Sequence, residues 1–85
     1  MLVKKRQVVT YDFEGIFDGY CIDVETKIDR NDMLEFYIYH KQYNIKKYMF
    51  GVFKKTLKKE NLSVEDIISG NIEQHIKSYK KLIEE

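Results

Sequence analysis

The sequence predicts an α+β domain in which a three- to four-stranded antiparallel β-meander is followed by one C-terminal amphipathic α-helix packed on one face of the sheet (ββββα). Apolar and polar residues alternate from Tyr20 to Ile28, which is typical of a strand with one buried and one solvated face. Apolar residues recur at spacings of three and four from Val64 to Ile83, which is typical of a helix. The chain has 85 residues and no Pro-rich linker, so we expect a single domain over 1–85.

Two more strands are predicted around the one that begins at Tyr20. Residues 8–13 are β-branched and aromatic, and the two glycines in 14–19 indicate a connection to the next strand. A polar turn is expected at 29–32, because Asp and Asn side chains readily bond to their own backbone. Residues 34–39 then alternate again. Strands joined by such short turns form an antiparallel meander.

The stretch 42–59 is compatible with a helix or a strand. In a helix, apolar residues between Ile45 and Leu57 would share one face, but Phe50 would be exposed and Gly51 would weaken the helix. In a strand, 45–53 offers the aromatic and β-branched residues that sheets favour. We favour a fourth strand over roughly 45–53, with a lysine-rich link over 54–60.

The final helix is expected over 63–83. Ser63 is placed to act as the N-cap, and the acids that follow it suit the positive end of the helix dipole. Gly70 could divide this segment into two helices. The apolar stripe keeps its phase across Gly70, so we favour one helix with a possible kink.

Charge is unevenly distributed along a chain whose net charge is only +1. Residues 7–40 carry eight acids against two basic residues, whereas residues 41–59 carry seven lysines and no acid. Such opposed blocks can steer and orient an encounter with another protein or with a second copy.

The cellular compartment is predicted from three features that the sequence lacks. The single cysteine cannot form an internal disulfide, which fits a reducing compartment. The first residues lack the apolar core of a signal peptide, and no apolar run approaches membrane-spanning length. We therefore expect a cytoplasmic protein with no membrane partner.

No catalytic or metal-binding arrangement is apparent in the sequence. Cys21 could pair with His40 or His75, but we expect Cys21 on the solvated face of its strand beside Asp23 and Glu25, and carboxylates disfavour a thiolate. Zinc sites need Cys and His at close, paired spacings, which are missing. We predict a protein that is not an enzyme and has no cofactor or metal.

The function that we predict is protein–protein interaction. One helix can cover only one face of the sheet, so some aromatic side chains must point away from it. Aromatic residues supply much of the binding energy at protein interfaces. The predicted interface, which could support self-association as a homodimer, contains Tyr37, Tyr39, Tyr48 and Phe50.

The alternative is a nucleic-acid-binding accessory protein that uses the lysine block. Lysines neutralise phosphates, and aromatic residues between them can stack on bases. Arginine, the usual reader of bases and phosphates, is almost absent from the chain. The candidate lysines are Lys46, Lys47, Lys54, Lys55, Lys58 and Lys59.

Overall fold

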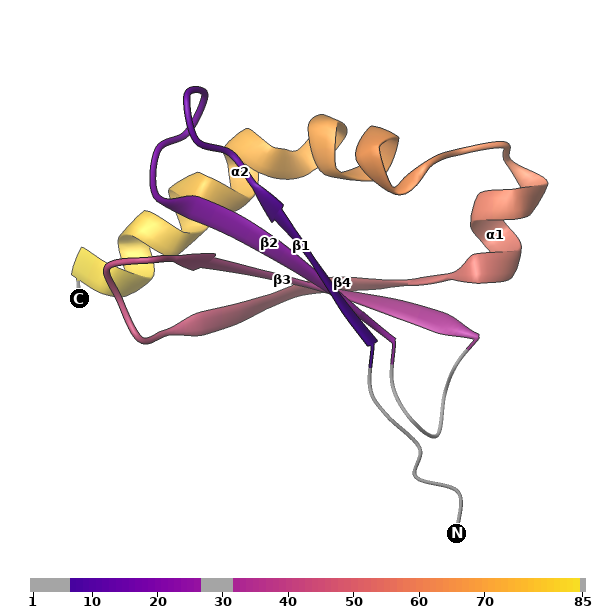
Figure 1. The fold of residues 1–85 in the computed structure, drawn as a ribbon, viewed down its shortest axis with the longest axis horizontal. Helices are drawn as coiled ribbons and strands as arrows, with labels where there is room; N and C mark the ends of the chain where they lie inside the picture. The colour runs from indigo at the N-terminus through magenta and orange to yellow at the C-terminus, as the bar shows by residue number, and fades with distance from the viewer. Residues whose placement is uncertain (1–6, 27–31, 85) are drawn as a thin grey trace, which may run out of the picture.

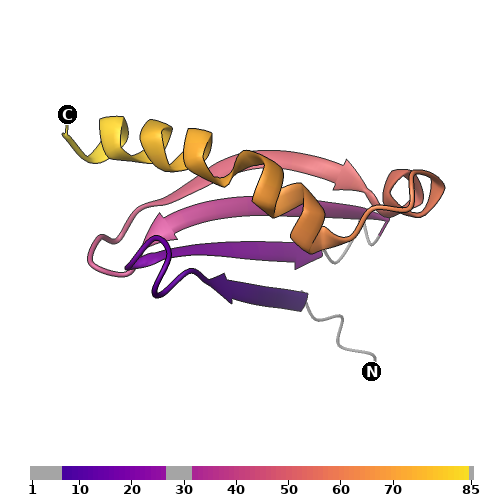
Figure 2. The same ribbon diagram turned by 90° about the horizontal axis from the view of Figure 1, so that it is seen from above.

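A computed structural model describes residues 7–26 and 32–84. Its elements are β1 (Gln7–Asp12), β2 (Tyr20–Thr26), β3 (Met33–His40), β4 (Lys46–Phe53), α1 (Lys54–Lys59) and α2 (Val64–Glu84). The strands form one antiparallel sheet in the order β1-β2-β3-β4, and α2 crosses one face of it (Figure 1, Figure 2). The predicted ββββα architecture, including the fourth strand, is confirmed.

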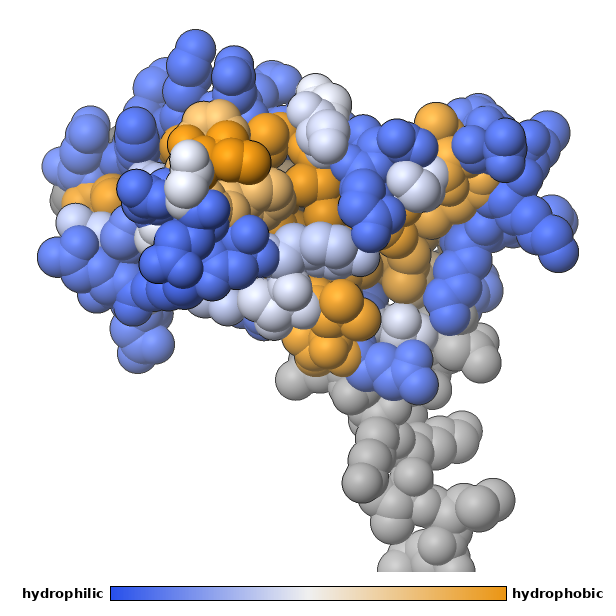
Figure 3. Space-filling view, turned by 45° about the horizontal axis from the view of Figure 1, so that its top comes forward, coloured by the Kyte–Doolittle hydropathy of each residue, from blue (hydrophilic) through white to orange (hydrophobic). Residues whose placement is uncertain are grey.

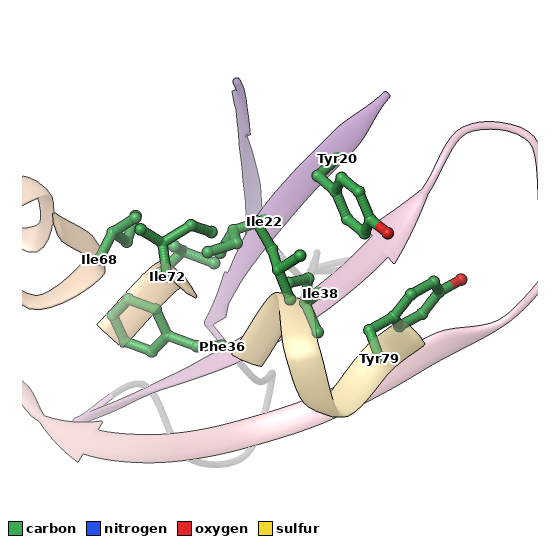
Figure 4. Packing of buried hydrophobic residues seen from close by; sticks show 9 residues of the cluster. Tyr20, Ile22, Phe36, Ile38, Ile68, Ile72 and Tyr79 are labelled. Atoms are coloured by element: carbon green, nitrogen blue, oxygen red, sulfur yellow. The ribbon is translucent and has the colours of Figure 1, made fainter. Parts of the chain in front are cut away.

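The core lies between α2 and the sheet face that it covers (Figure 4). The four central residues of the sheet side come from β2 and β3: Ile22, Val24, Phe36 and Ile38. The helix contributes Ile68, Ile72, Ile76 and Tyr79, which belong to the apolar stripe expected from the sequence. Burying an aliphatic or aromatic side chain of this size stabilises the fold by about 1.5–3 kcal/mol each.

The start of α2 is fixed by Ser63, as predicted. The backbone N–H of Asp66 donates to Oγ of Ser63 at 3.1 Å, and the N–H of Ser63 donates to Oδ2 of Asp66 at 3.0 Å. This reciprocal pair satisfies two backbone donors at the helix start. The helix then continues through Gly70 to Glu84, so the interpretation as one helix is confirmed.

The lysine-rich segment that we expected to be a link is instead the short helix α1. Lysine and leucine are good helix formers, and the buried Leu57 anchors the segment to the rest of the protein. Six residues contain only one buried apolar position, so a helical period could not be recognised there.

An irregularity in the β3–β4 pairing changes which side chains share a face. Phe36 pairs with Phe50 and Tyr37 pairs with Tyr48, so Met49 is an extra residue on β4. Strict alternation would place Tyr48 and Phe50 on the same face of the sheet. The bulge places them on opposite faces, because one additional residue reverses the side-chain alternation.

The expectation of a solvated face on β2 is wrong. Cys21, Asp23 and Glu25 point away from α2, yet they are only 1%, 8% and 4% exposed. Because β2 is an inner strand, side chains from the neighbouring strands can lie over them.

Of the helices that the structure describes, none is both long and apolar enough to span a membrane.

Candidate interaction surface

The sheet face opposite α2 is the candidate interaction surface, and we call it the open face. The register of the four strands assigns it the following residues: Val8, Thr10, Asp12, Cys21, Asp23, Glu25, Met33, Glu35, Tyr37, Tyr39, Lys46, Tyr48, Gly51 and Phe53. It therefore combines aromatic side chains on β3 and β4 with charged side chains on all four strands.

The aromatic part of the open face is built around Tyr37 and Tyr48. Their rings meet edge to face, with centroids 5.6 Å apart. Tyr48 is 52% exposed, whereas Tyr37 and Tyr39 are partly buried. A Cβ atom at Gly51 would lie 3.1 Å from the Tyr48 hydroxyl, so this glycine leaves the space in which Tyr48 lies across the strand.

Phe50 was predicted to belong to this surface, but the bulge places it on the other face. Its ring stacks on Phe36 with centroids 4.8 Å apart and an interplanar angle of 24°. On its other side it lies 5.6 Å from the ring of His75 in α2. Phe50 is thus packed against the core, and three of the four predicted aromatic residues remain on the open face.

An ionic network connects the charged residues of the open face across the sheet. Nζ of Lys46 on β4 reaches over β3 to Oδ2 of Asp23 at 2.8 Å and Oε2 of Glu25 at 2.7 Å, both on β2. Thr10 on β1 donates to Oδ1 of Asp23 at 2.7 Å. The ammonium group also lies 5.2 Å from the ring centroid of Tyr37, a favourable cation–π distance.

This network determines the protonation of Lys46. Burial lowers the pKa of Lys46, but the hydrogen bonds and charges of Asp23 and Glu25 outweigh burial and raise the pKa overall. Lys46 is therefore a firmly held cation that bridges two carboxylates.

Tyr37 and Tyr39, the two tyrosines of β3 on the open face, are hydrogen-bonded and have raised pKa values. The Tyr37 hydroxyl donates to Oε2 of Glu35 at 2.6 Å. This hydrogen bond, followed by burial, raises the pKa of Tyr37 to about 12. Burial is also the main reason that the pKa of Tyr39 is raised. Tyr37 and Tyr39 are therefore neutral phenol groups at neutral pH.

The structure divides the six candidate lysines among three places. Lys46 lies in the ionic network of the open face. Lys47 pairs with Ile38 and points to the α2 side of the sheet, where its charge acts on His75. The other four are exposed on α1, and within the described part of the chain they form no ion pair: Lys54, Lys55, Lys58 and Lys59.

The candidate nucleophile and bases lie apart. Cys21 faces the open side of β2, while His40 faces the α2 side of β3 and His75 lies on α2. Burial raises the pKa of the Cys21 thiol, which disfavours the thiolate needed for nucleophilic or metal chemistry. The described residues contain no group of three or more His, Cys, Asp and Glu side chains that could hold a metal ion.

The ionic network was missed in the sequence. Asp23 and Glu25 at a spacing of two did indicate carboxylates on one side of a strand. Which of the seven lysines in 41–59 contacts these carboxylates depends on the strand order and on how far the lysine side chain extends. Neither can be predicted from the spacing of residues along the chain.

No protein-family model matches the chain, and searches of curated proteins and of solved structures found no similar protein.

Proposed function

We propose that this protein is a non-catalytic, cytoplasmic interaction module that associates with a second copy of itself through the open face. The observation that carries the proposal is the exposed Tyr48, held edge to face against Tyr37 on the sheet face that α2 leaves uncovered. Buried aromatic anchors supply most of the binding energy in protein interfaces, and tyrosine is among the most frequent.

The charges of the open face suit an interface because they are already paired. Covering an unpaired ion with a partner costs several kcal/mol, whereas a paired ion loses much less hydration. Lys46 contacts Asp23 and Glu25 in the single chain, and the Tyr37 hydroxyl is bonded to Glu35. A second copy could therefore cover the tyrosines without leaving a buried cation unpaired.

The arrangement favours a two-fold symmetric dimer. In such a dimer the same patch of each copy faces the other, so one aromatic cluster supplies both halves of the contact. Tyr48 of each copy would lie against the Tyr37–Tyr48 pair of the other. The ionic network would then lie at the edge of the contact.

Sedimentation equilibrium over a range of protein concentrations tests this proposal. We expect wild-type protein to dimerise and Tyr48→Glu to weaken dimer formation roughly tenfold or more, because a carboxylate would have to be buried without a partner. The matched control is Leu82→Glu, which changes a 40% exposed apolar residue on α2 and should leave the dimer intact. A wild-type protein that stays monomeric at millimolar concentration would overturn the proposal.

A second candidate function, nucleic-acid binding, is favoured by the four exposed α1 lysines. Phosphate binding by lysines gives an affinity that falls steeply with salt. If this function holds, Lys54→Glu with Lys55→Glu should weaken binding to duplex or single-stranded nucleic acid and reduce its salt dependence. Tyr48→Glu should leave that binding unchanged, because Tyr48 lies on the open face and the lysines lie on α1.

A further inference from the structure

The loop between β1 and β2, residues 13–19, holds the most exposed large apolar side chain in the described part of the chain. Ile16 is 75% exposed, although its neighbours Phe13 and Phe17 pack against the core. The backbone N–H groups of Ile16 and Phe17 both donate to the carbonyl oxygen of Phe13, at 3.0 and 2.8 Å. The loop thus packs two partly buried aromatic rings against the core and points its isoleucine outward.

Further contacts hold the loop in this conformation. The N–H of Glu14 donates to Oδ1 of Asp12, and the N–H of Gly15 donates to Oδ1 of Asp18. Gly15 and Gly19 both have positive φ values, 92° and 87°, which other residues rarely adopt. Little conformational entropy would be lost when such a preorganised loop binds a partner.

The charge around Ile16 is acidic. Asp12 is paired with Lys41 at 2.6 Å, but Glu14 and Asp18 form no ion pair with any described residue. An exposed apolar side chain flanked by two carboxylates is best matched by an apolar surface with a basic rim.

The α1 region provides a surface of that kind. Its four exposed lysines are followed in the chain by an exposed apolar residue, Leu62, at 38%. Figure 3 shows hydrophobic surface beside the hydrophilic side chains at this end of the molecule. With Glu60 included, residues 53–62 carry four positive charges and one negative charge, a net of +3.

The two surfaces cannot meet within one chain. The β1–β2 loop and α1 lie toward opposite ends of the molecule in both ribbon views (Figure 1, Figure 2). We propose that the 13–19 loop of one copy docks on the α1 surface of another, with Ile16 against Leu62 and with Glu14 and Asp18 facing the lysines. The occupant is a second copy because the same chain carries both complementary surfaces.

Such a contact is head-to-tail, so it leaves a free loop at one end of the assembly and a free α1 at the other. Unless the rotation between successive copies closes the assembly into a ring, further copies can add at both ends without limit. The contact uses neither Tyr37 nor Tyr48, so it does not depend on the open-face dimer proposed above.

Crossed loss-of-contact variants test this contact. Both variants carry Tyr48→Glu, which weakens the open-face dimer, and both are compared at a concentration at which that weakened dimer is dissociated. One adds Ile16→Asp to disable the loop, and the other adds Lys58→Glu with Lys59→Glu to disable α1. Sedimentation velocity should find each variant monomeric alone, whereas an equal mixture should form a complex of two copies, because each retains the surface that the other lacks.

The controls make each outcome decisive. Tyr48→Glu alone should still form species that grow with concentration and shrink as salt is raised, because the contact includes exposed opposite charges. Circular dichroism should show that both variants are folded, since all the changed side chains are exposed. A Tyr48→Glu protein that is monomeric at every concentration overturns the head-to-tail contact and leaves the open-face proposal standing. A mixture that stays monomeric also overturns it.

Discussion

The hydroxyl of Tyr79 donates a 2.6 Å hydrogen bond to the backbone carbonyl oxygen of Ile45. This bond joins the C-terminal half of α2 to the residue that precedes β4. Tyr79 is 0% exposed, and its ring also meets Tyr20 edge to face with centroids 6.0 Å apart. One side chain therefore fills the core and fixes the position of the helix relative to the β3–β4 turn.

Removing only the hydroxyl should have a moderate effect. Tyr79→Phe keeps the ring and loses the hydrogen bond, so we expect the free energy of unfolding to fall by about 1 kcal/mol. Urea denaturation followed by circular dichroism measures this change. The control is Tyr48→Phe, whose ring is exposed; it should change stability by less than about 0.5 kcal/mol. Equal effects for the two variants would contradict the role assigned to Tyr79.

The second prediction concerns the ionic network of the open face. Lys46→Met leaves Asp23 and Glu25 without the cation that bridges them. Removing one partner of a buried ion pair costs about 3–5 kcal/mol, but the Lys46 side chain is 39% exposed, so we expect about 2 kcal/mol. Lys47→Met, one residue along the strand and on the other face, should cost less than about 0.5 kcal/mol. Urea denaturation at pH 8 compares them, and a Lys46→Met protein as stable as the wild type would refute the network's contribution.

The strands and the long helix could be predicted from the sequence because their patterns are long and regular. The alternation that begins at Tyr20 and the apolar stripe from Val64 to Ile83 are long enough to outweigh local exceptions such as Gly70. The capping role of Ser63 was also accessible, because it depends on residues that are neighbours in the chain.

The composition of the open face could be predicted only in part. The side chain of Phe50 points to the core because of a bulge at Met49, and nothing in the local sequence marks that extra residue. Burial of Cys21 and Asp23 depends on side chains from other strands. Lys46 reaches its partners across an intervening strand, and local periodicity carries no information about such contacts.

The third prediction compares two glycines of the β1–β2 connection. Both have a positive φ, so replacing either by Ala should cost about 1–2 kcal/mol in backbone strain. A Cβ at Gly15 would meet nothing within 4 Å, whereas a Cβ at Gly19 would overlap the imidazole of His40. We expect Gly19→Ala to lose about 1–3 kcal/mol more than Gly15→Ala, because overpacking adds to the strain. Thermal and urea unfolding measure the difference, and equal losses would contradict the close packing of Gly19 on His40.

The last prediction concerns pH and His75. Burial is the main cause that lowers the pKa of His75 below the usual 6.5, and the charge of Lys47 adds to it. The ring of His75 also lies 5.6 Å from the ring of the uncharged Phe50. The folded state therefore resists protonation, while the unfolded state takes up a proton near pH 6.5. It follows that the free energy of unfolding should be highest above pH 6.5 and should fall as the pH drops through 6.5 toward the lower pKa of the folded state.

Urea denaturation at pH 8 and pH 5.5 measures this loss, and two variants isolate its cause. His75→Gln cannot titrate, so it should lose less stability than the wild type between these pH values. Lys47→Gln removes only the smaller cause, so its loss should lie between those of the wild type and His75→Gln. If the wild type and His75→Gln lose the same stability between pH 8 and pH 5.5, groups other than His75 cause the loss of stability at low pH. The neutral state of His75 beside Phe50 and Lys47 then makes no contribution to the free energy of unfolding.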